Sequence, residues 1–249
     1  MICSYCKKEV PSSREICPKC NHPIKLIPIP PGGIIRFGRY EWYVLDRQAD
    51  RALILTKNVI EKRAYHSQEA EVTWETCDMR KYLNSEFYDS FSASDRERII
   101  EVINETNDNP WYGTSGGNPT TDKVFLLSLE EVVQYFGDSG QLKTKNRNPG
   151  CDWCKDEFFF FLSDRYNIAR RAVDDSCVVC CWRLRSPGAN GRYVAIVLGD
   201  CRGEDEFDHG DICVDGHGGH LIDGHMNYDC HGGLTREQGV RPALWLSIK

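Results

Sequence analysis

Short hydrophobic runs separated by polar turns predict that much of this chain folds as strands. Apolar residues gather at positions 35–37, 42–45 and 52–55, and a polar stretch at 46–51 divides the last two runs. Runs of this length bounded by turn-forming residues are typical of strands, so we expect a β-hairpin here. The same pattern at residues 178–184, 193–198 and 243–246 predicts further strands toward the end of the chain.

Apolar residues at helical spacing occur in the middle of the chain. Within residues 74–91 they are Met79, Tyr82, Leu83 and Phe87, and this spacing predicts a helix. Residues 107–121 are rich in Gly and Asn and are expected to form a loop. The apolar run at 124–127 is interpreted as a short buried strand, and the run at 158–162 is expected in the core.

Two capping signals mark the starts of further helices. Ser92 with Asp95 resembles a capping box, and the helix after it would have an apolar face made of Ile99, Ile100 and Ile103. Ser128 and Glu131 form a similar pair before a helix that we expect to end at Gly137. Strands interspersed with a few helices indicate the α+β fold class.

Composition divides the chain into a small head and one larger domain. The chain has 249 residues, with 41% hydrophobic and 27% charged residues, a balance typical of globular proteins. We expect a cysteine-rich module at 1–24, a Pro- and Gly-rich linker at 25–33 and a domain at 34–249. No run of 18 apolar residues occurs, so no membrane span is expected. The start, Met1 to Cys6, lacks the features of a signal peptide, which favours a cytoplasmic location.

Cysteine spacing predicts a zinc ribbon in the head. Cys3 and Cys6 form one Cys-x2-Cys pair, and Cys17 and Cys20 form a second. Two such knuckles can surround one zinc ion with four thiolates, which leaves no open coordination position. The zinc would therefore be structural, and it would supply folding free energy that a module this small cannot obtain from a hydrophobic core. Two disulfides or free thiols are the alternative.

A second cysteine quartet is spaced less tightly. Cys151 and Cys154 form one pair, and Cys177 and Cys180 form the other. This quartet could hold a second zinc ion, or its members could be small buried thiols beside a core strand. The sequence leaves both interpretations open.

Charge is unevenly distributed. The net charge of the whole chain is −6, and residues 199–233 hold nine acidic residues and only one basic residue, Arg202. An acidic surface repels phosphate backbones, so nucleic acid is not expected as the partner of this segment.

Several motifs resemble those of a known group of proteins. They are Phe37-Gly38 with Trp42, then Asp122 to Ser128, Cys181 to Gly188, and Gly239 to Leu246. Over residues 34–249 the chain resembles C-type-lectin-fold proteins related to the formylglycine-generating enzyme, and more narrowly the variable proteins of diversity-generating retroelements. One departure is Arg183, where related sequences usually carry a second Trp. The resemblance implies a C-type-lectin-like fold, with antiparallel strands, flanking helices and long insertions around a stable core.

The resemblance also implies a non-enzymatic display protein with a variable segment at about 189–231. In such proteins error-prone reverse transcription changes template adenines, and Asn codons then never become Lys, Glu, Gln, Met or Trp. Of these five residue types, residues 199–233 contain only Glu204, Glu206 and Met226, and the rest of the chain is about twice as rich in them. The absence of an apolar period also fits an exposed, tolerant surface. The candidate ligand-binding residues are Asn190, Arg192, Tyr193, Cys201, Arg202, Asp205, Phe207, Asp208, His209, Asp211, Cys213, Asp215, His217, His220, Leu221, Asp223, His225, Asn227, Tyr228, Asp229, Cys230 and His231.

The residue types of the segment indicate which ligand to expect and which alternative functions stay open. No Glu-Pro-Asn or Gln-Pro-Asp triplet of calcium-dependent sugar binders occurs, which favours a protein ligand over a sugar. The His and Cys residues of the segment could instead bind a metal, although none forms a tight metal-binding pair. A metal-dependent or thiol enzyme that uses Cys180 or Cys181 is the alternative function, but adjacent cysteines on a strand point to opposite faces.

Overall fold

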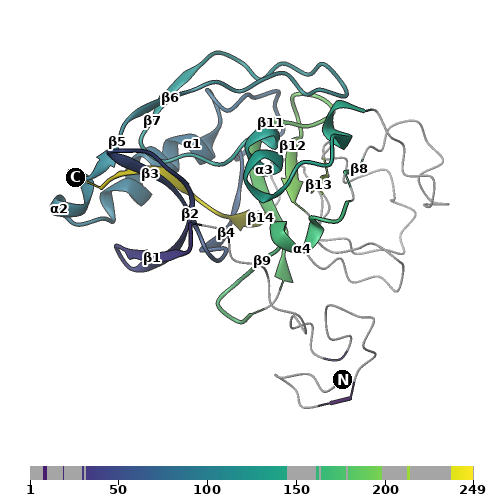
Figure 1. Cartoon of the computed structure of the whole chain (residues 1–249). Coiled ribbons are helices and arrows are strands. Elements are labelled where there is room, and N and C mark those ends of the chain that lie inside the picture. Colours follow the sequence, from purple (N-terminus) through teal and green to yellow (C-terminus); the bar gives the residue numbers. More distant parts are fainter. Residues whose placement is uncertain are drawn as a thin grey trace.

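The computed structural model describes residues 8–9, 19, 30, 32–144, 161–162, 164–177, 179–197, 212–213 and 237–248. Within them the chain has a mixed α+β architecture with mostly antiparallel sheets and a few short helices (Figure 1). The strands are β1 (Ile34–Phe37), β2 (Tyr40–Arg47), β3 (Arg51–Thr56), β4 (Glu61–Ala64), β5 (Ile99–Ile100), β6 (Val102–Asn104), β7 (Thr120–Asp122), β8 (Phe161–Leu162), β9 (Ala172–Val173), β10 (Val179–Cys180), β11 (Trp182–Pro187), β12 (Val194–Val197), β13 (Ile212–Cys213), β14 (Glu237–Val240) and β15 (Ala243–Ser247). The helices are α1 (Asp78–Tyr82), the π-helix η1 (Leu83–Phe87), α2 (Ala93–Arg96), α3 (Leu129–Phe136), the 3-10 helix η2 (Gln141–Lys143) and α4 (Asn167–Arg170). The predicted fold class, α+β, is confirmed.

One sheet joins the beginning of the domain to its end. Its strand order is β1-β2-β3-β15-β5, and all its neighbours are antiparallel. The predicted β-hairpin is confirmed, because β2 pairs with both β1 and β3. The last strand, β15, lies between β3 and β5, so the C-terminal strand completes a sheet begun by the first strands (Figure 1).

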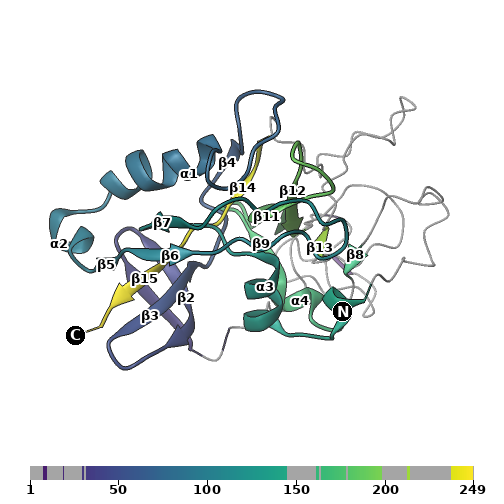
Figure 2. The same cartoon turned by 90° about the horizontal axis from the view of Figure 1, so that it is seen from above.

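An aromatic cluster packs the first helices against this sheet. Phe91 lies 5.3 Å from Phe37 and 5.4 Å from Phe87, measured between ring centroids, and Trp42 is fully buried beside them. Pairs of rings at these separations contribute about 0.5–1.5 kcal/mol beyond the burial of their area. Figure 2 shows α1 and α2 along one flank of the five-stranded sheet.

The second large sheet forms the centre of the molecule. Its order is β4-β14-β11-β12-β13-β8, and β11 and β14 are its one parallel pair among the described strands. Every residue of β11 and β12 is buried. Helix α3 packs against β11 and α4 (Figure 1).

The helix predicted at 74–91 is confirmed in its main part and begins later than its apolar pattern. Helix α1 begins after Cys77, whose thiol accepts a hydrogen bond from the Arg80 amide. It continues through the π-helical turn η1. There the Asn84 side chain donates to the Val124 carbonyl and accepts from the Lys123 amide. Single π turns of this kind often occur at special sites, and here the turn carries a tertiary hydrogen-bonding residue.

The helix predicted from Ile99, Ile100 and Ile103 is wrong. Helix α2 does begin after Ser92 as expected, but it ends at Arg96. Ile99 and Ile100 form β5 and pair with Leu246 and Trp245 of β15, and Ile103 in β6 is 73% exposed. β-branched residues fit the edge of a sheet well, and this pairing outweighs their helical spacing.

The capped helix after Ser128 is confirmed, but the apolar run before it, residues 124–127, does not form the predicted strand. Both hydrogen bonds of the capping box are present, and α3 ends at Gly137 as its C-cap. Residues 124–127 are fully buried but form a single bridge, Phe125 with Ala243, in place of a strand. Arg185 also bonds to the backbone of this run. Its guanidinium Nη1 donates to the Leu126 carbonyl, and its backbone amide donates to the Leu127 carbonyl.

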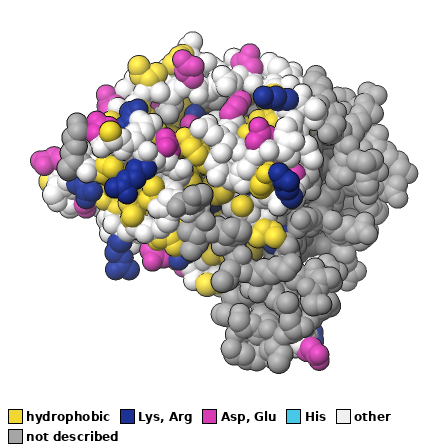
Figure 3. Space-filling view, in the orientation of Figure 1, with side chains coloured by type: hydrophobic (Ala, Val, Ile, Leu, Met, Phe, Trp, Pro, Cys, Tyr) yellow, Lys and Arg dark blue, Asp and Glu magenta, His cyan; other side chains and the backbone are white. Residues whose placement is uncertain are grey.

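The end of the expected linker bonds to the domain. Gly33 donates its amide to the Pro30 carbonyl at 2.9 Å and accepts the Val44 amide at 3.0 Å. Pro30 is buried. Side chains of both charge signs are interspersed with apolar ones over the described part of the surface in Figure 3. The described surface on this face therefore does not create an electrostatic potential of a single sign.

Candidate functional site

The described residues cover a small part of the predicted binding segment. They include Asn190, Arg192 and Tyr193, and the backbone of Cys213. The other ligand-binding candidates, from Cys201 to Asp211 and from Asp215 to His231, lie outside the described residues. The same holds for the predicted zinc ligands Cys3, Cys6, Cys17, Cys20, Cys151 and Cys154. The site is therefore built from the framework that holds the segment.

Two strands, one inside the segment and one shortly after it, pair with the same residue at the centre of the sheet. Trp182 in β11 lies opposite Val197 of antiparallel β12 and opposite Gly239 of parallel β14. Neighbouring strands lie about 4.8 Å apart, so Val197 and Gly239 are separated by about 10 Å across β11. Val197 and Gly239 are thus both fixed by hydrogen-bonded strands around a fully buried Trp.

A glycine allows this close approach on the β14 side. The Gly239 amide donates to the Cys181 carbonyl at 3.0 Å. A Cβ atom at position 239 would lie 2.3 Å from that same carbonyl oxygen, closer than real Cβ atoms come. Glycine is therefore required for this contact between the two motifs that bracket the segment.

The first residues of the segment form a tight turn between β11 and β12. Gly188 donates its amide to the Tyr193 carbonyl at 2.9 Å, and Tyr193 donates its amide to the Asn190 carbonyl at 3.1 Å. The Asn190 side chain accepts the Arg192 amide at 2.9 Å. Asn190 and Arg192 are exposed and Tyr193 is half-buried, so the turn presents side chains to solvent while its backbone is held.

Two loops hold this turn from outside. The buried Asn109 side chain donates to the Pro187 carbonyl at 2.9 Å, and Thr114 donates its hydroxyl to the Ala189 carbonyl at 2.8 Å. On the other side the Val72 amide donates to the Gly191 carbonyl at 2.9 Å. These contacts fix the position of the turn on loops distant in sequence, and they were not predicted from the sequence.

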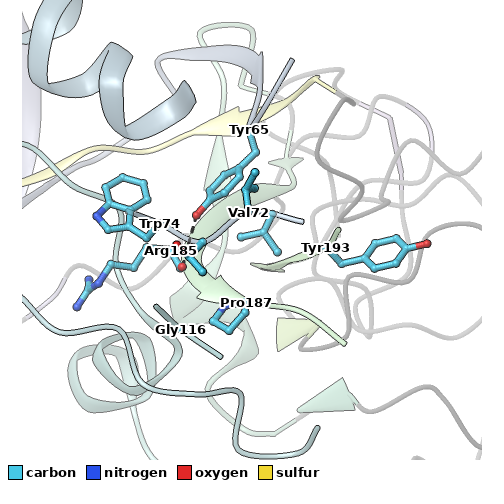
Figure 4. Close-up of a pocket in the computed structure, with 9 residues that line it drawn as sticks. Tyr65, Val72, Trp74, Gly116, Arg185, Pro187 and Tyr193 are labelled. Carbon is cyan, nitrogen blue, oxygen red and sulfur yellow. Dashed lines mark hydrogen bonds between the residues drawn. The ribbon is translucent and has the colours of Figure 1, made fainter. Parts of the chain in front are cut away.

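A small cavity lies beneath the turn. It is lined by Tyr65, Val72, Thr73, Trp74, Gly116, Arg185, Pro187, Tyr193 and Val194. Its volume is about 10 Å³, which is the space of about one water molecule. In Figure 4 the ring of Tyr193 points away from Tyr65 and Trp74, and the Tyr65 hydroxyl donates to the Arg185 carbonyl. The cavity is too small for a substrate, so binding by this region depends on its surface.

A buried carboxylate, that of Asp122, accepts a hydrogen bond from Trp74, one of the residues that line the cavity. Asp122 is 1% exposed and accepts hydrogen bonds from side chains of four different segments. The donors are Trp74 Nε1 at 3.0 Å, Arg80 Nε at 2.6 Å, Asn104 Nδ2 at 3.0 Å and Thr120 Oγ1 at 2.6 Å. A carboxylate satisfied in this way is stable in the interior, and removing it would leave buried donors without partners. The sequence signal is the Asp at the start of the motif Asp122 to Ser128, one residue before the buried apolar run.

Arg185 joins the sheet to the capped start of α3. It forms a bidentate pair with Glu131, with Nη2 at 3.0 Å from Oε1, and Glu131 also accepts the Ser128 amide as part of the capping box. Nη1 of the same guanidinium donates to the Leu126 carbonyl at 2.7 Å. The planar guanidinium can satisfy these acceptors together, which a Lys could not.

Arg183, the residue that departs from the resembled motif, is fully buried. Its guanidinium carbon lies 5.8 Å from the ring centroid of Tyr65. Burial lowers the pKa of Arg183 to about 10, although the nearby Tyr65 and the thiols of Cys181 and Cys77 act in the opposite direction. At neutral pH the residue therefore stays cationic and lies over an aromatic ring, at the position where the resembled motif usually carries a Trp.

The cysteines considered for metal binding or catalysis lie in different environments. Cys177 is exposed, with φ at 59°, and Cys180 is buried with its Sγ 3.4 Å from Asp174 Oδ2. Burial and the Asp174 carboxylate raise the pKa of Cys180 to about 12. Because the thiolate is the nucleophile, a thiol protonated to this extent is a poor catalytic group. Cys181 is buried in the next position.

The part of the chain that the structure describes holds no candidate metal cluster and no candidate membrane span. There, no three His, Cys, Asp or Glu side chains converge on a common point. No helix among the described residues is long and apolar enough to span a bilayer.

The fold and the framework define a protein with a mixed, mostly antiparallel α+β domain that returns its last strand to its first sheet. Residues 49–248 match the family model described as Domain of unknown function (DUF6273), and the chain therefore belongs to that family. Strands β1 and β2 precede the matched region, but β2 pairs with β3 and β1 pairs with β2, so the folded unit begins before it. Neither a curated protein nor a solved structure matches the chain.

Proposed function

We propose that this protein is a non-enzymatic binding protein that displays the segment of about 189–231 as a variable recognition surface for a protein ligand. The proposal includes a C-type-lectin-like fold for the domain, diversification of the segment by a retroelement, and a zinc ribbon at residues 1–24. The observation that carries it is the pairing of Trp182 with Val197, inside the segment, and with Gly239, shortly after it.

Because of this pairing, the stability of the domain depends little on the sequence of the segment. Trp182, Val197 and Gly239 are held by sheet pairing, and their side chains and close contacts belong to the buried core. The entropic cost of closing a loop between fixed ends rises only slowly with loop length. Each doubling of the length costs about 0.6 kcal/mol more. A framework of this kind supports many different sequences between the same two anchors.

The turn at the start of the segment supports a role in recognition. Asn190, Arg192 and Tyr193 project from a backbone held by Asn109, Thr114 and Val72. Tyr contributes large contact area at low entropic cost, and Arg and Asn add adaptable polar contacts. A turn fixed in advance loses little conformational entropy when a partner binds.

The environment of Cys180 supports binding over thiol catalysis. Its thiol is protonated at neutral pH, and the Asp174 carboxylate 3.4 Å from its Sγ disfavours the thiolate further. An enzyme that used this cysteine would need the opposite electrostatic environment.

Sequencing this gene across many cells of one source population tests the proposal. We expect variants to cluster in codons 189–231, while codons 1–180 stay constant. The constant codons of the framework, such as those for Trp182 and Gly239, are the internal control. A segment as constant as the framework would contradict diversification and would make the His and Cys residues of the segment candidates for a fixed metal or catalytic site.

A further inference from the structure

The turn between β11 and β12 contains the one Asn-Gly pair of the whole sequence, Asn190 and Gly191. Asn190 is exposed and Gly191 is half-buried. The side-chain amide carbon of an Asn can react with the backbone nitrogen of the next residue. A Gly at that position hinders the reaction least, because it has no Cβ. The pair therefore places a reactive carbonyl and its nucleophile in adjacent residues that water reaches.

A hydrogen bond folds the Asn190 side chain over its own backbone. Its Oδ1 accepts the Arg192 amide at 2.9 Å. The ring that this bond closes includes both Asn190 Cγ and the Gly191 nitrogen, which are the two atoms that must join. The Arg192 N–H also polarises the Cγ carbonyl and stabilises the oxyanion that forms when the nitrogen adds to it. The folded turn therefore provides proximity and electrostatic help for a reaction within the chain.

Neighbouring hydrogen bonds hold the turn in this arrangement. The Tyr193 amide donates to the Asn190 carbonyl at 3.1 Å, and the Val72 amide donates to the Gly191 carbonyl at 2.9 Å. The Asn190 carbonyl belongs to the same peptide group as the Gly191 nitrogen. A donor at that carbonyl draws electron density from the group and so eases loss of the Gly191 amide proton.

We propose that Asn190 is a self-modification site, at which the Gly191 nitrogen attacks the side-chain amide carbon to form a succinimide that water then opens to aspartate or isoaspartate. In the first step the N–Cγ bond forms and the Cγ–Nδ2 bond breaks. Nδ2 leaves as ammonia, with the proton that the Gly191 amide gives up through water. In the second step water adds to one of the two imide carbonyls. Opening at Cγ gives aspartate, and opening at the main-chain carbonyl gives isoaspartate.

Either product changes the turn. The neutral amide of Asn190 becomes a carboxylate next to the exposed Arg192. In isoaspartate the main chain also runs through Cβ and Cγ, which makes it one carbon longer and shifts the hydrogen bonds of Tyr193 and Val72 out of register. The reaction itself does not depend on the proposed function. Its effect on recognition does, because the modified turn would begin the ligand-binding segment with a different charge and shape.

Incubation of the full-length protein at pH 8 in water enriched in oxygen-18 tests the reaction. Peptide mass spectrometry follows Asn190 and Asn118. We expect Asn190 to lose ammonia and gain one heavy oxygen, with isoaspartate among the products, at least as fast in the folded protein as in urea. Asn118 is also exposed, but Pro119 follows it and has no amide proton to lose, so Asn118 is the internal control and should stay unchanged. Equal conversion of both residues would indicate direct hydrolysis of side-chain amides and would overturn the proposal.

A variant separates the ring-forming route from other losses of ammonia. Gly191→Ala should slow the conversion at least about tenfold, because a Cβ hinders the attacking nitrogen and would lie 3.0 Å from Glu71 Cβ. Glu69→Ala, at an exposed position of the loop that contacts the turn, is the matched control and should leave the rate unchanged.

Two results would overturn the proposal. One is an Asn190 that stays intact in the folded protein while the unfolded chain converts, since the fold would then block the attack. The other is an unchanged rate in Gly191→Ala. Codons 189–231 that were constant across many cells would instead reject the proposed function and would leave these rates as they are.

Discussion

Gly239 lies beside Trp182 in the parallel pair of β14 and β11, with its amide 3.0 Å from the carbonyl oxygen of the residue before that Trp. The two motifs that bracket the proposed recognition segment thus meet in space, although more than fifty positions separate them in the sequence. The pairing holds both motifs in place, and the segment between them begins and ends beside the central strand β11.

Replacing Gly239 by Ala should destabilise the domain. The new Cβ would lie 2.3 Å from the Cys181 carbonyl oxygen, so β11 and β14 must move apart. We expect Gly239→Ala to lower the free energy of unfolding by about 1–3 kcal/mol, as for other overpacked sites. Urea unfolding measures the change. Glu237→Ala, at an exposed position of the same strand, is the control and should change stability by less than about 0.5 kcal/mol. Equal effects of the two substitutions would contradict the close contact.

Asn109 should control the turn that carries Asn190 and Tyr193. Its side chain donates to the Pro187 carbonyl and accepts the amides of Trp111 and Tyr112. Asn109→Ala leaves these buried groups unpaired, so we expect a loss of about 1–3 kcal/mol. Hydrogen exchange of the Tyr193 amide should become faster in the same variant.

Asn118 provides the matched control for this loop. Its amide bonds to Glu75 at the surface. Asn118→Ala should leave exchange at Tyr193 unchanged. If both variants left the turn equally protected, the hydrogen bonds of Asn109 would not hold it.

The buried pair of Asp164 and Arg170 should make stability depend on pH. Their side chains are 3% and 0% exposed, with Oδ1 and Nη1 2.8 Å apart. Burial acts to raise the pKa of Asp164, but hydrogen bonds from Arg170, Ser139 and the Tyr166 amide together with the Arg170 charge outweigh it and lower that pKa. A carboxyl with a lowered folded-state pKa stabilises the fold above its unfolded value, about 3.9, and this contribution is lost as the pH falls through the folded value.

Asp164→Asn should therefore lose about 3–5 kcal/mol at pH 7, because it leaves a buried guanidinium without its counter-charge. The difference from the unmodified protein should shrink as the pH falls from about 5 toward 3. Thermal unfolding across this range measures it. Asp89→Asn, at a largely exposed pair with Arg96, should follow the unmodified curve. A difference that stayed constant with pH would show that Asp164 does not titrate as described.

Cysteine reactivity separates the binding proposal from its thiol-enzyme alternative. With pKa values of about 12, raised mainly by burial, Cys180 and Cys77 hold little thiolate at pH 8. We expect iodoacetamide to modify them roughly 100-fold or more slowly than the exposed Cys177. Peptide mass spectrometry of the native protein, with the unfolded protein as control, follows each site. Rapid modification of Cys180 in the native state would favour an activated thiol.

Zinc content tests the two cysteine quartets. We expect the first quartet to hold one zinc ion through four thiolates, and a second ion at the other quartet would bring the content near two and would require Cys180 as a thiolate, against its raised pKa. Cys17→Ser with Cys20→Ser should remove one, and Cys151→Ser with Cys154→Ser should remove the other. A value near one in the unmodified protein would eliminate the second site and leave Cys177 and Cys180 as ordinary thiols.

Local patterns predicted those elements that depend on neighbours in the sequence. The hairpin of β1, β2 and β3 follows from short apolar runs, and α3 follows from Ser128 and Glu131, whose capping bonds reach only three residues. The same reasoning failed at Ile99 and Ile100. Their helical spacing was real, but pairing with β15, which lies far along the chain, decided their conformation.

The sequence by itself also determined the boundaries of the candidate site, through the motifs around Trp182 and Gly239. Only the tertiary structure decided that Trp182 pairs with both Val197 and Gly239, that Asn109 and Thr114 hold the first turn, and that β13 interrupts the segment. The physical reason is that sheet pairing and buried polar contacts join residues by distance in space. A hydrophobic pattern records which side chains are buried, but it does not record which distant backbone groups they meet.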